Sequence, residues 1–149
     1  MSQEIVPASI GMNAAVAKIE NESFTCPWSK ESFDEVLANP SFDYFICLED
    51  NEVAGYIIGF TASDECEIAN IAVRSDRRGR GIGFMLMQHF ISFSSEKGAK
   101  SFFLEVRAGN TAAKALYQKC GFYEIGTRKN YYRKPTEDAV VMMMVHDDG

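Results

Sequence analysis

The sequence predicts an α/β (α+β) fold, in which helices cover both faces of one mixed sheet. Apolar runs with strand character are interspersed with segments whose apolar residues repeat at helical spacing. Their order is helices, then an antiparallel meander of strands, then strand–helix–strand–helix–strand. The chain has 149 residues, is 46% hydrophobic and shows no internal repeat, so we expect a single domain over residues 1–149.

Helices are predicted first, and a pair of strands follows. Residues 9–22 carry apolar side chains on a rough helical stripe, namely Ile10, Met12, Ala15, Val16 and Ile19. A second helix begins after Ser29, whose hydroxyl can accept a hydrogen bond from a backbone N–H of the first turn. Residues 43–50 and 52–63 are predicted strands, joined at Asp50-Asn51, a pair typical of a tight turn.

Strands and helices alternate in the second half of the chain. A long strand is predicted over residues 65–75 and a helix over 81–97, with core positions Ile82, Met85, Leu86, Phe90 and Phe93. A strand over 100–108 precedes a short helix over 110–120, which Gly121 closes. Two strands over 122–133 and 138–146 complete the chain, and the run Met142–Met144 is interpreted as strand and core.

Composition disfavours several classes of function. The net charge of −6 argues against general nucleic-acid binding. No apolar run approaches the roughly 20 residues that a membrane span needs, and the first residues lack the pattern of a signal peptide, so a cytoplasmic location is expected. The four cysteines are scattered and the two histidines lie far apart, which predicts free thiols and no metal site.

The stretch RSDRRGRGIGF, residues 74–84, is called here the glycine–arginine loop, and it lies between a predicted strand and a predicted helix. A helix N-terminus offers unpaired N–H groups, and glycines let an anion approach the backbone, so the loop suggests a phosphate site. It fits neither the dinucleotide-binding G-x-G-x-x-G pattern nor the Walker A pattern. What fits is R-x-x-G-x-G, from Arg78 to Gly83. A solvated basic turn with capping glycines is the alternative.

That pattern resembles the pyrophosphate loop of the GNAT superfamily of N-acetyltransferases, which use acetyl-coenzyme A. The resemblance implies a mostly antiparallel sheet that splays at the acetyl-coenzyme A site. It also implies that the backbone of Ile71, Ala72 and Val73 holds the pantetheine arm and the thioester. The other implied contacts to the cosubstrate come from Arg78, Gly79, Arg80, Gly81, Ile82, Gly83, Phe84 and Asn110.

Two side chains are candidates for proton transfer. Glu105 interrupts the apolar strand SFFLEVR, where a carboxylate is costly unless it is paired or hydrated, and burial would suit it as a base. The alternative is a glutamate on the solvent face or one paired with Arg107. Tyr117, on the next predicted helix, could protonate a leaving thiolate, or could simply pack that helix on the sheet.

The segment LEVRAGNTAAKALYQKCGF resembles the signature of the RimI-type family, the ribosomal-protein-alanine N-acetyltransferases. PWS at residues 27–29, RKNYYR and EDAVVM resemble further parts of that family, so the match covers roughly residues 20–144. The resemblance implies that Glu105 is the general base and Tyr117 the general acid. It implies direct acetyl transfer to a protein N-terminus, the alanine of a small-subunit ribosomal protein.

The acceptor side is less sharply defined. The resemblance places Ala69, Tyr131 and Tyr132 at the substrate, whereas the acidic run at residues 64–67 is either a site for a basic peptide or a solvated strand end. Ser75, Gly109 and Ala69 depart from the family pattern, where proline, serine and a bulkier apolar residue are usual. Acetylation of another amine (a lysine, a polyamine or an antibiotic) and a non-catalytic coenzyme A-binding module remain alternatives. A monomer or weak dimer is expected.

Overall fold

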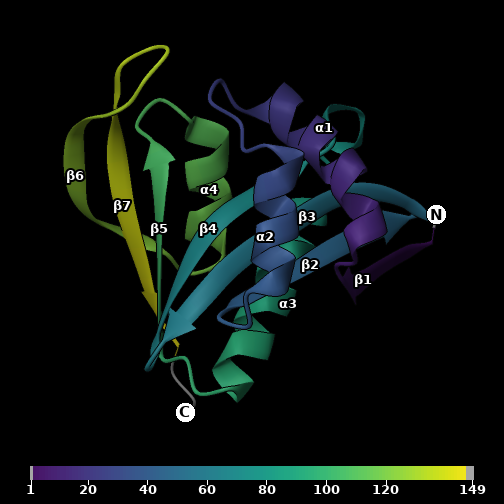
Figure 1. Ribbon diagram of the computed structural model, residues 1–149. Helices are drawn as coiled ribbons and strands as arrows, with labels where there is room; N and C mark the ends of the chain where they lie inside the picture. The colour runs from purple at the N-terminus through teal and green to yellow at the C-terminus, as the bar shows by residue number, and fades with distance from the viewer. Residues whose placement is uncertain (1, 147–149) are drawn as a thin grey trace.

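The computed structural model describes residues 2–146 and contains a seven-stranded sheet in the order β1-β2-β3-β4-β5-β7-β6 (Figure 1). The elements are β1 (Gln3–Pro7), the 3₁₀ turn η1 (Ile10–Met12), α1 (Asn13–Ser23), α2 (Lys30–Ala38), β2 (Phe42–Glu49), β3 (Glu52–Ala62), β4 (Glu65–Val73), the 3₁₀ turn η2 (Ser75–Arg77), α3 (Ile82–Glu96), β5 (Ser101–Arg107), α4 (Thr111–Lys119), β6 (Tyr123–Tyr132) and β7 (Glu137–Val145). Among the described residues no helix is long and apolar enough to cross a membrane.

The sheet is antiparallel at every strand pair except one. β4 and β5 run parallel, and their pairing extends only from Glu65↔Ser101 to Glu67↔Phe103. Beyond that point the two strands diverge, and Figure 1 shows them separating from the lower end of the sheet toward the end where α4 begins. The predicted fold class, a mixed and mostly antiparallel sheet that splays at one place, is confirmed.

Helices cover both faces of the sheet, as the order of elements predicts. On one face α1 and α2 bury a cluster that includes Val16, Phe33 and Tyr56. On the other face α3 and α4 bury a larger cluster that includes Leu86, Phe90 and Phe102. Met142 and Met144 belong to this second cluster, so the methionine run is strand and core as predicted.

Local signals in the sequence account for most boundaries. Ser29 caps α2, its Oγ accepting a hydrogen bond of 3.2 Å from the backbone N–H of Ser32. Asp50 and Asn51 both adopt positive φ, 52° and 68°, as a tight hairpin turn requires.

Two features at the N-terminal end differ from the prediction. The strand β1 was not predicted, because its five residues are mostly exposed and carry no clear alternation. Ile10 was placed on the apolar stripe of a helix over residues 9–22, but it lies in η1 and is 65% exposed. The α-helix itself begins at Asn13, so only the later part of the predicted stripe is buried.

Candidate active site

A β-bulge in β4 lies next to the point where β4 and β5 separate. Ile58 faces Asn70 and Gly59 faces Ile68 across the β3–β4 pair, so Ala69 has no partner residue. The extra residue reverses the alternation of the strand. Ile68 contacts the α3–α4 cluster, whereas Ala72 contacts the α1–α2 cluster. Beyond Glu67 the edge of β4 that faces β5 pairs with no strand of residues 2–146, and this edge includes the predicted segment Ile71–Val73.

The glycine–arginine loop ends at the N-terminus of α3. Gly79 and Gly81 adopt left-handed φ of 79° and 82°, and Gly81 is the N-cap residue. The first helical hydrogen bond runs from the N–H of Met85 to the carbonyl of Gly81, at 3.0 Å. The N–H groups of residues 82–84 therefore have no acceptor within the helix. Gly83 serves packing instead, since a Cβ there would lie 3.1 Å from Leu116 of α4.

The arginines of this loop contact carboxylates and carbonyls of the protein itself. Arg74 pairs with Asp76 at 2.7 Å and with Glu52 at 3.1 Å. Arg77 pairs with Glu52 at 3.0 Å and also with Glu49. Both of these arginines are therefore matched by acidic residues of the protein.

The two arginines predicted to contact the cosubstrate also have protein partners. Arg78 donates to the carbonyl oxygen of Val73 at 3.1 Å and to the hydroxyl of Ser23 at 3.0 Å. Arg80 donates to Glu49 at 3.1 Å. What the loop offers an anion is therefore chiefly its glycine-bounded backbone and the partial positive charge of the α3 N-terminus.

Glu105 lies on β5 where that strand has left β4. Its neighbours Leu104 and Val106 are buried in the α3–α4 cluster, so the carboxylate points to the opposite face of the sheet. The Glu105 side chain is 18% exposed, and its partner is Arg128 of β6, with Nε 3.2 Å from Oε2. That contact is an ion pair without hydrogen-bond alignment, and the buried Oε2 accepts no hydrogen bond from the described residues. The alternative pairing with Arg107 is wrong.

Tyr117 lies on α4 and is buried in the α3–α4 cluster, with its ring centroid 6.3 Å from that of Phe122. Burial raises the pKa of Tyr117 well above its ordinary value, and the nearby phenol of Tyr132 adds to the effect. Burial and then the charge of Glu105 raise the pKa of Tyr132 to about 12. Tyr132 thus lies within electrostatic range of both candidate catalytic residues.

Arg107 joins two loops and the start of β7 beside this site. Its guanidinium donates to the carbonyls of Arg133 and Pro135 in the β6–β7 turn, at 2.8 and 3.0 Å. It also donates to the hydroxyl of Thr25 in the α1–α2 loop at 3.1 Å and pairs with Glu137 at 3.1 Å.

The same guanidinium fixes one of the two predicted acceptor-side tyrosines. It stacks over the ring of Tyr132, 4.6 Å from the centroid. Tyr132 in turn meets Tyr131 edge to face at 5.1 Å, and Tyr131 is 46% exposed with Arg128 over its ring. The predicted tyrosine pair therefore borders Glu105.

The departures from the family pattern have visible structural roles. Ser75 donates its backbone N–H to Glu22 at 2.9 Å, a bond that proline at this position could not make. Gly109 donates its N–H to Glu137 at 2.6 Å, and a Cβ there would lie 2.7 Å from the same carboxylate. Asn110 still caps α4, accepting from the N–H of Ala113 at 3.1 Å.

A buried carboxylate on α1 was missed by the sequence analysis. Glu20 is 2% exposed and accepts hydrogen bonds from the phenol of Tyr56, the amide of Asn70 at 2.7 Å and the backbone N–H of Trp28 at 2.9 Å. It therefore ties the α1–α2 loop to β3 and to β4 just past the bulge. The signal available in the sequence was its position four residues after Val16, on the buried side of the predicted helix.

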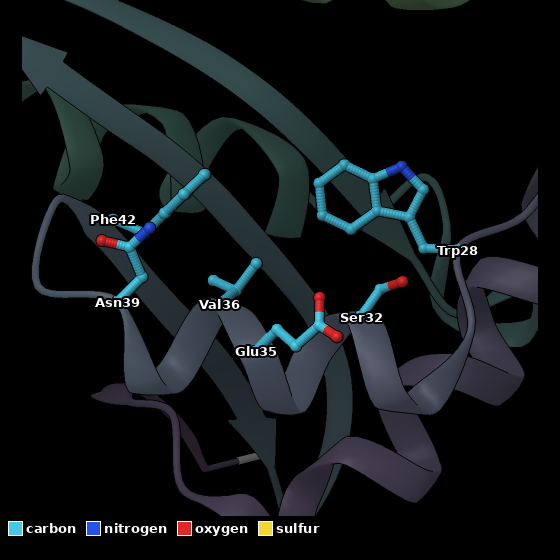
Figure 2. A pocket seen from close by; sticks show the side chains of 6 residues that line it. All are labelled: Trp28, Ser32, Glu35, Val36, Asn39 and Phe42. Atoms are coloured by element: carbon cyan, nitrogen blue, oxygen red, sulfur yellow. The ribbon is translucent and has the colours of Figure 1, made fainter.

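Other features of the chain lie apart from this site. A hollow of about 320 Å³ is formed by the loop before α2, by α2 and by the start of β2; Figure 2 shows its lining residues Trp28, Ser32, Glu35, Val36, Asn39 and Phe42. The acidic run at residues 64–67 lies at the end of β4 that pairs with β5, which favours a solvated strand end. All four cysteines are free, and residues 2–146 contain no group of His, Cys, Asp or Glu side chains placed to hold a metal ion.

Comparison with known proteins decides the family. The model of the Acetyltransferase (GNAT) family matches residues 13–122, which span α1 to the residue before β6. The chain belongs to the GNAT family. This agrees with the resemblance read from the glycine–arginine loop and with the splayed sheet.

Relatives within the GNAT family carry one specific name. A Bacillus subtilis protein, provisionally named a ribosomal protein bS18-alanine N-acetyltransferase, is 41% identical over 128 residues, 85% of each chain. A Salmonella typhimurium ribosomal protein bS18-alanine N-acetyltransferase is 38% identical over 136 residues, 87% of this chain and 88% of that protein. The crystal structure of the Escherichia coli ribosomal-protein-S18-alanine N-acetyltransferase superposes with a TM-score of 0.91 at 31% identity, covering 99% of this chain and 97% of that one.

Proposed function

We propose that this GNAT protein moves the acetyl group of acetyl-coenzyme A to the N-terminal α-amine of a protein, and that its acceptor is the N-terminal alanine of a small-subunit ribosomal protein of the bS18 type. The observation that carries the chemistry is Glu105, whose buried Oε2 accepts no hydrogen bond within the described residues, at the point where β4 and β5 separate. The same oxygen faces Nε of Arg128 at 3.2 Å without hydrogen-bond alignment, so a lone pair is available to accept a proton from an incoming ammonium group. The names of the relatives support the choice of acceptor.

The cosubstrate has a place that fits its shape and charge. Acetyl-coenzyme A carries a pyrophosphate, an extended pantetheine arm and the reactive thioester. The N–H groups at residues 82–84 suit the pyrophosphate, because Gly79 and Gly81 leave open space on the loop where a side chain would stand. The unpartnered edge of β4 along Ile71–Val73 suits the pantetheine arm. Asn110, at the start of α4, is a further contact in this proposal.

The chain's own residues supply the proton transfers. Glu105 takes a proton from the acceptor ammonium, directly or through a water molecule, and leaves a neutral amine. The amine nitrogen forms a bond to the thioester carbonyl carbon, and the carbon–sulfur bond breaks. Tyr117, whose raised pKa keeps its phenol protonated, gives its proton to the departing thiolate. The nitrogen loses its second proton as the amide forms, and this proton returns to the Tyr117 phenolate, directly or through water, so that the phenol is restored.

Direct transfer also agrees with the state of the nearest cysteine. Cys120 is half-buried at the end of α4, and burial raises the pKa of its thiol. A thiol held in its protonated form is a weak nucleophile, so a covalent acetyl-enzyme at this residue is disfavoured.

The acidity of the acceptor supports an α-amine. The pKa of an N-terminal amine is about 8 and that of lysine about 10.4, so at neutral pH the α-amine has a neutral fraction larger by about two powers of ten. A single glutamate is an adequate base for such a group. Tyr131 and Tyr132, with Ala69 at the bulge, border the position that we assign to the first residue of the acceptor.

Mass spectrometry after incubation with acetyl-coenzyme A tests the proposal. One peptide begins with alanine and carries the N-terminal sequence of the ribosomal protein; a matched peptide has a blocked N-terminus and an internal lysine. We expect acetylation of the first peptide at its α-amine and poor turnover of the second. Faster acetylation of lysine or of polyamines would overturn the acceptor, and the absence of any transfer would favour a non-catalytic coenzyme A-binding module. The proposal places the protein in the cytoplasm with its acceptor, as one acetyltransferase domain.

A further inference from the structure

Glu49, the last residue of β2, is a buried carboxylate whose role beyond pairing with the loop arginines has not been assigned. Its side chain is 0% exposed. It accepts hydrogen bonds from the amide of Gln3 at 2.8 Å, from Arg77 and from Arg80 at 3.1 Å. The bond from Gln3 and the bond and charge of Arg77 hold the pKa of Glu49 below its ordinary value, against the effect of burial.

These contacts tie the glycine–arginine loop to the β2–β3 hairpin. Arg77 and Arg80 lie 28 and 31 residues after Glu49, and Arg77 also reaches Glu52 at the start of β3. Burying a carboxylate is unfavourable unless donors surround it, and removing it would leave two arginines without this partner. The glycine–arginine loop is therefore attached to the β2–β3 hairpin through arginine side chains, independently of its glycines.

We propose that Glu49 is a positioning residue for coenzyme A: by holding Arg77 and Arg80, it keeps the glycine–arginine loop in the conformation in which the backbone N–H groups at the start of α3 converge on the pyrophosphate. The inference rests on the proposed function, since it takes the loop to be the pyrophosphate site. In this proposal the main role of Arg77 and Arg80 is to stabilise the conformation of the loop, and attraction of the charged ligand is a secondary role.

The proposal predicts that removing the negative charge of Glu49 weakens the binding of coenzyme A, the opposite of what electrostatics alone predicts. Glu49 is an anion close to a loop that would bind a polyanion, so electrostatics alone predicts that removing its charge tightens the binding of coenzyme A. If Glu49 orders the loop, the same change weakens binding, because the loop must then be ordered at the moment of binding. Salt screens the repulsion over about 8 Å at physiological ionic strength, but it does not restore the order of the loop.

Calorimetric titration with coenzyme A itself, without acceptor, measures the sign. We expect Glu49→Gln to bind coenzyme A about 10-fold more weakly than the unchanged protein, a loss equivalent to about 1.4 kcal/mol. Hydrogen exchange at the amides of residues 79–84 should accelerate in the free variant. In steady-state assays KM for acetyl-coenzyme A should rise, while KM for the acceptor peptide stays within about twofold, which a general loss of stability would not produce.

Two further variants make the test specific. Asp50→Asn removes the same charge from the neighbouring turn, where asparagine tolerates the φ of 52°, and it should bind coenzyme A within about twofold of the unchanged protein. Glu49→Asp keeps the charge but shortens the reach to the arginines, so it should also bind more weakly. This second variant decides the matter if Glu49→Gln does not fold.

The outcomes separate this inference from the proposed function. Unchanged or tighter binding of coenzyme A by a folded Glu49→Gln, or by Glu49→Asp where the first variant does not fold, would overturn the role of Glu49 alone. If the unchanged protein fails to bind coenzyme A, both the proposed function and the inference fall.

Discussion

Replacing Arg107 by lysine should damage the acceptor side of the site while sparing the cosubstrate side. Arginine presents donors in a planar fork, and here the fork reaches Thr25, Glu137 and two carbonyls of the β6–β7 turn. A lysine keeps the positive charge but cannot reach acceptors on separate segments at once, nor stack over Tyr132 in the same way. The α1–α2 loop and the β6–β7 turn would then lose their common attachment.

The contacts of Arg107 set the size of the effect. Four hydrogen bonds are present, and lysine can keep about two of them and lose the other two. Each lost bond is worth about 0.5–1.5 kcal/mol net, so the variant should lose about 1–3 kcal/mol of unfolding free energy. For a chain of this length that corresponds to a fall in Tm of roughly 3–10 °C. If ordering the α1–α2 loop and the β6–β7 turn for the acceptor peptide then costs about 1.4 kcal/mol more, KM for that peptide rises about 10-fold.

Thermal melts and initial-rate kinetics with both substrates varied measure these quantities. We expect Arg107→Lys to raise KM for the acceptor peptide about 10-fold and to leave KM for acetyl-coenzyme A within about twofold. Arg133→Lys is the matched control, because its side chain is exposed in the same turn and only its backbone carbonyl contacts Arg107. An unchanged KM for the peptide, or an equal rise in both KM values, would refute the reasoning even if Tm falls.

Three further predictions concern catalysis, the cosubstrate and acid stability. Glu105→Gln and Tyr117→Phe should each lower kcat by about 10²–10⁴-fold with KM for acetyl-coenzyme A little changed. The effect of Glu105→Gln should shrink at higher pH, where the amine loses its proton unaided. Turnover of Glu105→Gln at the wild-type rate at pH 7 would leave Glu105 with a structural role only. Gly81→Val places a β-branched side chain at an N-cap residue with a left-handed φ of 82°. Calorimetry should show a large loss of affinity for acetyl-coenzyme A in this variant, which should still fold. Unchanged binding would contradict the proposed loop site. The N–H of Gly109 and the Arg107 guanidinium lower the pKa of Glu137. The stabilisation by the Glu137 carboxylate is therefore complete above its ordinary pKa of 4.5 and is lost as pH falls through the lower folded-state pKa. When Tm is measured against pH, Glu137→Gln should show a smaller loss of Tm in acid than the unchanged protein.

Much of the fold could be predicted because the signals that specify it are local. The apolar spacing in α3, the N-cap Ser29 and the turn at Asp50-Asn51 each act within a few residues. The glycine–arginine loop was recognisable for the same reason, because glycines and a following helix form a contiguous pattern. β1 escaped detection because a short, exposed edge strand forms mainly through its pairing with β2, whose partner residues lie 38 to 46 positions later in the chain, from Pro7↔Phe45 to Gln3↔Glu49.

The ion pairs could not be predicted because they depend on strand register. Glu105 and Arg107 lie two residues apart on one face of β5, and the sequence alone allowed them to pair. In the sheet Glu105 lies opposite Val141 of β7, which lies opposite Gly126 of β6, and Arg128 is two residues further along β6. Only the order β5-β7-β6 brings Arg128 to Glu105. The pairing of Glu49 with Arg77 and Arg80 could not be predicted for the same reason, because these arginines follow Glu49 by 28 and 31 residues.

The bulge at Ala69 links the shape of the sheet to the polarity of the site. Ile68 packs toward α3, and in a regular strand Asn70 would point to that apolar face as well, leaving its amide buried without a polar partner. The extra residue reverses the alternation, so that Asn70 instead reaches Glu20 of α1, while Ile71 and Val73 pack toward α3. The reversal comes two residues after the last β4–β5 pair, at Glu67. One irregularity in β4 therefore coincides with the end of its pairing with β5 and directs its polar side chain to the face that carries Glu105.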